Sequence, residues 1–265
     1  MNNQLNKGAD IMGKDIQAAA QVVIQRAIER HGGMARYDQV GHIVCDVTTM
    51  GGFGMSRRGL HTKFPIPKIV TLFPSQNKAI LHDYPVAGRD CVYDNGRVAE
   101  VASGQTPVFE CDNHRVQMLS VSRFRRPWTT LDAAYFFGYA MTHYASLPFS
   151  LPGLKVVGFA QRDDGPWRSR IDFEYPKGSH THSQHETLYF DATNLLVRHD
   201  YCPEVSSPLA RAANFLHEYR DFDGYLITER RKVHFRLGRM VTPLVVMDAS
   251  IKVLEVGRIP ATVSA

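Results

Sequence analysis

Three histidines lie close together in the segment GSHTHSQHETLYF, at positions 180, 182 and 185. Imidazoles bind metal ions, move protons near neutral pH or simply occupy polar positions of a strand. In an extended segment, alternate residues share a face, so His180 and His182 point one way and His185 the other. A zinc site needs three or four ligands, and the sequence has no HExxH pair. We therefore expect no metal, unless a loop lets the three histidines converge with Glu186 or with a histidine from another strand.

The segment that follows, DATNLLVRHDY, predicts a second strand, because DATN is typical of a hairpin turn. Counting outward from that turn places Asp200 or Tyr201 opposite His185 or Glu186, within a residue or two. A carboxylate that accepts a hydrogen bond from an imidazole orients the ring and sustains its basicity. Asp200 with His182 or His185 could thus perform general acid/base chemistry. A polar pair on the outer face of the sheet is the alternative.

A third polar set lies on a helix that we predict from Thr129 to Pro148. Its body, LDAAYFFGYAMTHYASL, is apolar on nearly all sides, so other elements should cover it. Within it Tyr135, Tyr139 and His143 follow one another at intervals of four and form a single stripe. Such a stripe either makes isolated hydrogen bonds in the core or faces a cavity.

These segments provide candidate catalytic residues and candidate ligand-binding residues. One further candidate residue, Arg231, lies in the predicted strand TERRKVHF, where it could place a guanidinium inside a barrel to hold a ligand's carboxylate or phenolate. An exposed strand of ion pairs is the alternative for Arg231. The candidate catalytic residues are His143, His182, His185 and Asp200, and the candidate ligand-binding residues are Tyr135, Tyr139, Tyr201 and Arg231. No residue is assigned to a metal.

Other common catalytic motifs are missing from the sequence. There is no GxSxG nucleophile elbow and no phosphate-binding P-loop. The glycine-rich MGGFGM at 50–55 does not open a helix after a strand in the manner of a dinucleotide fingerprint, so we expect a flexible hairpin tip or lid. The four cysteines are widely separated, which is typical of buried free thiols in a reducing compartment. No cofactor is therefore expected.

The elements that must position these residues are two helices and many strands. Apolar residues recur at helical spacing over 15–31 and predict an amphipathic helix, which the glycines at 32 and 33 end. Elsewhere the period is two, which predicts strands near 37–48, 59–64, 68–73, 78–83, 91–93, 97–101, 155–161, 167–175, 187–191, 195–201, 222–228, 231–237 and 245–254. The alanine-rich 207–219 could be a short helix or a strand that begins late. The class is α+β with one large, curved antiparallel sheet.

Composition limits the class of protein further. The 265 residues carry a net charge of +5, but the basic residues are interleaved with 26 acids, which argues against nucleic-acid binding. No apolar run is long enough to span a membrane, and the first residues lack an apolar signal region, so we expect a cytoplasmic protein. We expect a disordered leader at 1–14, a single domain at 15–258 and a tail at 259–265. The oligomeric state is left open.

Several stretches together resemble a family of bacterial proteins that is associated with the half-barrel fold of the LolA-type lipoprotein carriers. They are AIERHGGMARYDQVGHIVCDVTT, WTTLDAAYFFGYAMTHYASLPF, ETLYFDATNLLVRHDY and YRDFDGYLITERRKVHF, in that order, within residues 18–255. The resemblance implies an incomplete β-barrel wrapped around a mostly buried helix, with an apolar cavity for a lipophilic guest. It implies no reaction, and no catalytic motif is transferred with it.

Two functions are compatible with these observations. The first is a cofactor-independent enzyme of the cyclase, isomerase, lyase or hydrolase type, which acts on a lipophilic small molecule by acid/base chemistry. The second is a non-catalytic binder or carrier of a hydrophobic or amphipathic ligand. The number of ionisable side chains at inward positions slightly favours the enzyme. Convergence of His143, Tyr139, His182 and Asp200 in one pocket would discriminate between them.

Overall fold

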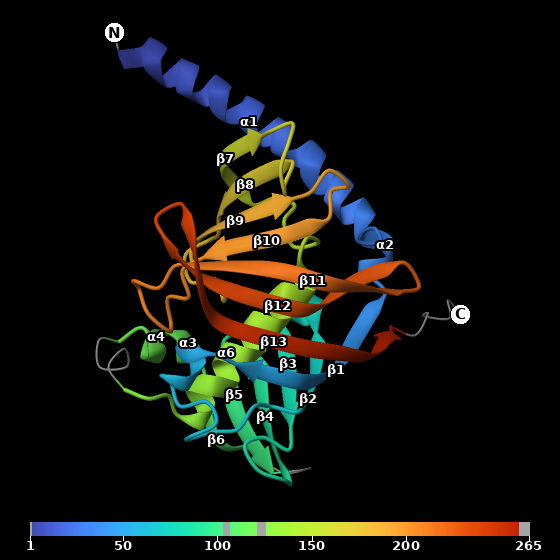
Figure 1. The fold of residues 1–265 in the computed structure, drawn as a ribbon, viewed down its shortest axis with the longest axis vertical. Helices are drawn as coiled ribbons and strands as arrows, with labels where there is room; N and C mark the ends of the chain where they lie inside the picture. Colours follow the sequence, from blue (N-terminus) through green and yellow to red (C-terminus); the bar gives the residue numbers. More distant parts are fainter. Residues whose placement is uncertain (1, 103–106, 121–125, 260–265) are drawn as a thin grey trace.

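The structure, a computed structural model, describes residues 2–102, 107–120 and 126–259, with side chains for 15–102, 110–120 and 126–259. In this part of the chain thirteen strands form one antiparallel sheet (Figure 1). The strands are β1 (Val40–Gly51), β2 (Ile69–Phe73), β3 (Lys78–His82), β4 (Arg89–Asp94), β5 (Arg97–Ala102), β6 (Pro107–Cys111), β7 (Lys155–Gln161), β8 (Ser169–Glu174), β9 (His185–Phe190), β10 (Leu196–Tyr201), β11 (Ala212–Phe222), β12 (Tyr225–Leu237) and β13 (Met240–Arg258).

The strand order shows how the sheet forms an incomplete barrel. It runs from β6 through β1, then from β13 through β7, so that β6 and β7 are the two edges. The chain thus builds one half of the sheet, crosses to the opposite edge and returns along the second half to the centre. The crossing segment contains α6 (Thr130–Ser146), which the curved sheet surrounds (Figure 1). The predicted half-barrel around a helix is confirmed.

Local sequence explains why α6 begins where it does and why it lies so close to the sheet. The Thr129 side chain accepts a hydrogen bond from the Asp132 amide, and the Thr129 amide donates to the Asp132 carboxylate, as the spacing predicts. Gly138 lets the helix approach β4, because a Cβ atom there would lie 2.3 Å from the Cβ of Tyr93. Most of the helix is buried, in agreement with its apolar circumference.

The second long helix, α1 (Asn2–Arg30), runs across the β7 end of the sheet, and its first turns project beyond it (Figure 1). The predicted apolar stripe is buried at Ala20, Val23, Ile24, Ala27 and Ile28. The helix begins at Asn2 instead of at residue 15, and so takes in the segment for which a disordered leader is expected. No proline interrupts residues 2–30, so the helical hydrogen bonds can continue upstream. Residues 260–265, most of the expected tail, lie outside the described residues.

Short helices connect the strands: α2 (Met34–Tyr37), α3 (Phe53–Ser56), the 3-10 turn η1 (Pro74–Gln76) and α4 (His114–Met118). The expected flexible tip at 50–55 is instead the end of β1 followed by α3, which is packed against β13. Gly52 has a φ of 132° and lies so close to β13 that a Cβ would meet the Val246 carbonyl oxygen at 2.5 Å. The glycines therefore serve close packing.

Two strand predictions are wrong, in both cases because residues in or beside the predicted strand have a positive φ. Residues 59–64 form turns, because Gly59 (φ 111°) and His61 (φ 67°) adopt left-handed conformations that a strand does not allow. The strands expected at 222–228 and 231–237 are one strand, β12. The hairpin turn lies earlier, at Asp223 and Gly224, both with positive φ. The alanine-rich segment becomes the late strand β11.

None of the described helices is both long enough and apolar enough to cross a bilayer.

Candidate functional site

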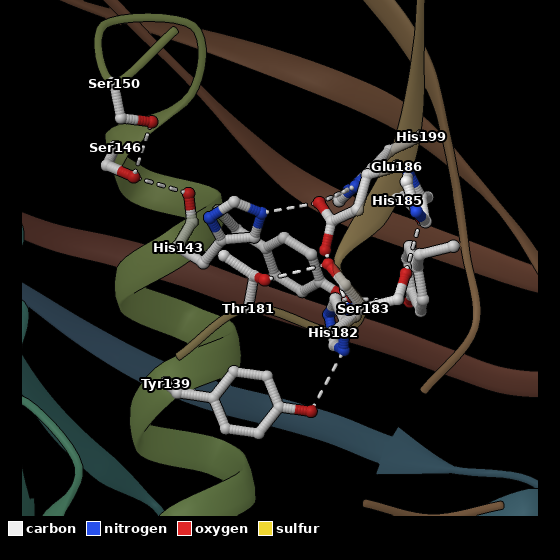
Figure 2. Close-up of polar contacts among 12 residues, drawn as sticks. Tyr139, His143, Ser146, Ser150, Thr181, His182, Ser183, His185, Glu186 and His199 are labelled. Carbon is white, nitrogen blue, oxygen red and sulfur yellow. Dashed lines mark hydrogen bonds and ion pairs between the residues drawn. The ribbon is translucent and has the colours of Figure 1, made fainter. Parts of the chain in front are cut away.

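The predicted polar sets meet between α6 and the β9–β10 hairpin (Figure 2). Glu186, on the inner face of β9, accepts hydrogen bonds at one oxygen, Oε2, from two imidazoles. The distances are 2.9 Å from His143 Nε2 of α6 and 2.6 Å from His199 Nε2 of β10. The second carboxylate oxygen accepts from the Ser183 amide at 3.1 Å. All three side chains are almost fully buried.

His182 lies beside this trio and connects it to tyrosines. Its Nδ1 is 3.1 Å from the Tyr139 hydroxyl, and its Nε2 is 2.6 Å from the Tyr144 hydroxyl. The ring stacks on Tyr201 at a centroid distance of 3.8 Å. The Tyr144 and Tyr201 hydroxyls are 2.8 Å apart, so the hydrogen bonds run without interruption from Tyr139 to Tyr201. We call these seven residues, His143, Glu186, His199, His182, Tyr139, Tyr144 and Tyr201, the inner cluster.

Burial governs the protonation states of the inner cluster. Desolvation opposes ionisation of Glu186, but its contacts with His143 and His199 hold the pKa of that carboxyl well below 4.5. Burial lowers the pKa of His182 well below 6.5 and also lowers the pKa of His199, so both imidazoles are neutral at pH 7. Burial raises the pKa of Tyr201 well above 10, so its hydroxyl keeps its proton.

Two other predicted ligand residues adjoin the inner cluster. Tyr135, one turn before Tyr139, hydrogen-bonds through its hydroxyl to His180 Nδ1 at 2.8 Å. The Arg231 guanidinium lies over the ring of Tyr144, 4.0 Å from its centroid, and its Nη1 has no partner among the described residues. Arg231 is therefore an inward-facing cation, as predicted, and the exposed ion-pair alternative is wrong for this residue.

The prediction for Asp200 and His185 is wrong in its geometry. The register pairs Asp200 with Thr187, within the stated uncertainty, but strand alternation turns both Asp200 and His185 to the outer face. Asp200 there accepts two hydrogen bonds of 2.7 Å from Arg198 and lies 3.0 Å from Arg236. His185 is exposed. Asp200 therefore pairs with arginines and not with His182 or His185, so the expected catalytic set does not converge.

The structure replaces that pair by residues one position away. His199 and Glu186 are the inward neighbours of Asp200 and His185, and Tyr144 follows His143 on α6. The alternation of side chains along the strands could have identified Glu186 and His199. Because the apolar residues at 188 and 190 face the core, position 186 of β9 faces it too, and so does position 199 of β10, which pairs with 188. Tyr144 lies off the four-residue stripe, so the spacing argument did not select it.

A cavity of about 760 Å³ lies beside the inner cluster, between α3, the start of α6, the β10–β11 connection and strands β12 and β13. Apolar side chains, among them Phe136, Val233 and Phe235, make up most of its lining. No acidic residue is found among the described residues that line it. Four arginines line it as well: Arg57, Arg58, Arg126 and Arg211. The cavity is thus apolar inside and positively charged where these arginines lie.

Phe136 and Tyr201, the latter a member of the inner cluster, lie between the cavity and the His182 imidazole. Both line the cavity, while the Phe136 ring also contacts that of His182 and the Tyr201 ring stacks on it. The histidines and Glu186 do not line the cavity. A molecule in the cavity would therefore touch the inner cluster through Tyr201 and Phe136.

The chain was compared with known proteins. No family model and no curated protein matches it. Among solved structures, it is similar to the LolA superfamily protein NE2245 from Nitrosomonas europaea, with a TM-score of 0.43 and 8% sequence identity. The similarity covers 88% of this chain and 91% of that chain.

Proposed function

We propose that the protein binds an amphipathic small molecule with a lipophilic body and an acidic group in the 760 Å³ cavity. The observation that carries this proposal is the combination of an apolar lining with four arginines and no lining carboxylate among the described residues. The volume falls in the range of about 300 to 1,000 Å³ that is typical of small-molecule sites. The apolar side chains would hold the body by excluding water, and a guanidinium would hold the acid.

Charge supports an anionic ligand more than a neutral one. Neither Arg57 nor Arg211 has a carboxylate partner among the described residues, and Arg57 lies over the Phe53 ring at 5.6 Å. Guanidinium groups bind carboxylates with two parallel hydrogen bonds, which a neutral ester cannot reproduce. The pocket would therefore distinguish a free acid from its ester.

The test is a titration with 11-(dansylamino)undecanoic acid, a fluorescent fatty acid, and with its methyl ester. The proposal expects saturable binding of one acid molecule per chain and weaker binding of the ester. Ala210→Trp, which puts an indole on the partly exposed cavity wall, should weaken binding of both by at least about tenfold. Ala87→Trp, in the exposed turn between β3 and β4, is the matched control and should bind like the wild type. Equal binding by the two tryptophan variants would refute the proposed site.

Acid/base catalysis remains a second candidate, and one observation favours it. Tyr201 lines the cavity, and its hydroxyl hydrogen-bonds to Tyr144, which in turn bonds to His182. This chain of hydrogen bonds could pass a proton between a bound molecule and the buried imidazole. The test is deuterium exchange from D₂O into the carbon next to the carbonyl of 2-undecanone. Catalysis predicts faster exchange with the wild type than with Tyr201→Phe, whereas no exchange above background removes this support.

A further inference from the structure

The inner cluster contains three groups that converge as metal ligands do. His143 Nε2, Glu186 Oε2 and a ring nitrogen of His199 come from α6, β9 and β10, and the three ligand atoms lie within 4.8 Å of one another. Figure 2 shows the two imidazoles meeting the same carboxylate from opposite sides. His143 is 43 residues from Glu186 in the sequence, so its convergence with the β9–β10 hairpin is a product of the fold. We infer that these three residues bind a divalent transition-metal ion, with zinc as the reference ion.

The donor set suits such an ion. Two imidazole nitrogens and one carboxylate oxygen are the protein ligands of many mononuclear zinc and iron(II) sites. With ligand bonds of about 2.0 to 2.1 Å, neighbouring ligand atoms of a tetrahedral ion lie about 3.3 Å apart. The observed separations from Glu186 Oε2 are 2.9 Å to His143 and 2.6 Å to His199. To admit an ion, the first separation would widen by about 0.4 Å and the second by about 0.7 Å, shifts on the scale of side-chain adjustment.

The negative charge of Glu186 is a second, independent reason to infer a metal ion at this site. Buried carboxylates are generally paired with a cation or bound to a metal, because isolated charges are costly in a protein interior. Asp200, on the outer face of the same hairpin, has Arg198 and Arg236 as partners. Glu186 is as deeply buried, yet no lysine or arginine among the described residues bonds to it. A divalent ion would add a fixed positive charge beside a carboxylate whose described partners are two imidazoles and one backbone amide.

The surroundings define what kind of site this would be. Only three protein ligands are present in the trio, which leaves a fourth position for water or another small group, as in zinc sites that are not purely structural. The imidazole of His182 is already held by two tyrosine hydroxyls and belongs to the wall of the site. Because the three ligand side chains are buried, the ion should enter during folding or by local opening and should exchange slowly.

The experiment is elemental analysis of the full chain, purified without a histidine tag, before and after equilibration with zinc. The expected result is one zinc per chain after removal of excess metal. Glu186→Gln and His199→Gln should each lower the retained zinc by at least about tenfold. His185→Gln, next to Glu186 but exposed on the other face, should retain it fully. Cobalt(II) in place of zinc gives visible absorption that reports histidine and carboxylate ligands, whereas thiolate absorption would assign the metal to a cysteine.

The wild type alone decides the question if the variants do not fold. Chelated wild-type protein should unfold at a lower temperature than the same sample with one equivalent of zinc. Wild-type protein without stoichiometric metal after equilibration overturns the inference, and so does full retention of zinc by both variants. Titration of the chelated sample with dansylaminoundecanoic acid measures the proposed ligand binding separately. The proposal of ligand binding and the inference of a metal ion can therefore fail independently.

Discussion

The inner cluster and the cavity are neighbours with opposite properties. The inner cluster is closed and polar, and its imidazoles, carboxylate and hydroxyls are bonded to one another. The cavity is mostly apolar, and its charged lining residues are arginines, with no carboxylate among the described residues that line it. The rings of Tyr201 and Phe136 line the cavity and also contact the His182 ring of the inner cluster. The difference indicates that ionisable groups beside a cavity can belong to the core, and that the cavity's own lining is the better basis for proposing a ligand.

The largest effect should come from the centre of the inner cluster. Glu186→Gln replaces an acceptor of two imidazole hydrogen bonds by an amide that also points a donor at one of them. We expect a loss of about 3 kcal/mol in the free energy of unfolding, measured by urea denaturation. His185→Gln, its exposed neighbour, should change that free energy by less than about 0.5 kcal/mol. Similar values for the two variants would mean that the inner cluster does not stabilise the fold.

Filling the cavity should have the opposite effect: it should weaken ligand binding and leave the free energy of unfolding nearly unchanged. Ala210→Trp should weaken binding of the dansyl fatty acid by at least about tenfold, equivalent to about 1.4 kcal/mol, because the indole takes the ligand's space. The unfolding free energy should change by less than about 0.5 kcal/mol, since the residue is partly exposed. A large loss of stability without loss of binding would contradict the separation of the two regions.

Mildly acidic pH should lower the folding stability that depends on the inner cluster. The folded-state pKa of His182 is lowered by burial, whereas the unfolded imidazole titrates near 6.5. The unfolded state therefore binds more protons below pH 6.5, and stability that is complete above this pH is lost as the pH falls. Urea unfolding at pH 7.5, 6.5 and 5.5 should show this loss, and His182→Gln should reduce its slope.

A second buried histidine serves as a reference for that measurement. His31, which is not part of the inner cluster, has its pKa lowered to about 4 by burial and should contribute a slope of the same sign. His182→Gln should leave the contribution of His31 to the slope of stability against pH unchanged. A slope that is unchanged in His182→Gln would show that His182 titrates normally in the folded protein.

The smallest effect should come from the rim of the cavity. Arg211→Ala removes one exposed guanidinium, so binding of the dansyl acid should weaken only about threefold, because solvent screens exposed charges. Binding of the methyl ester should not change. Arg26→Ala, on the exposed face of α1, is the matched control for loss of a positive charge. An equal loss for acid and ester would indicate packing by the arginine stem and not recognition of the acid.

The sequence allowed the fold to be predicted where local chemistry decides it. The capping box at Thr129 and the hairpin turn after β9 each fix an element through neighbouring residues. The assignment of Asp200 failed because a shift of one residue turns a side chain to the other face of a strand. The resemblance implied an apolar cavity, but its position and its arginines could not be predicted, since α3, the β10–β11 connection and β13 meet there only in the folded chain.

The most direct test of the account is a crystal structure of the protein with dodecanoic acid brominated at its tail. Anomalous scattering locates the bromine without reference to the rest of the ligand. The account predicts a bromine peak among the apolar side chains of Phe136, Val233 and Phe235, with the carboxylate toward the arginines. A bromine peak outside this cavity, or no bound acid at saturating concentration, would contradict it.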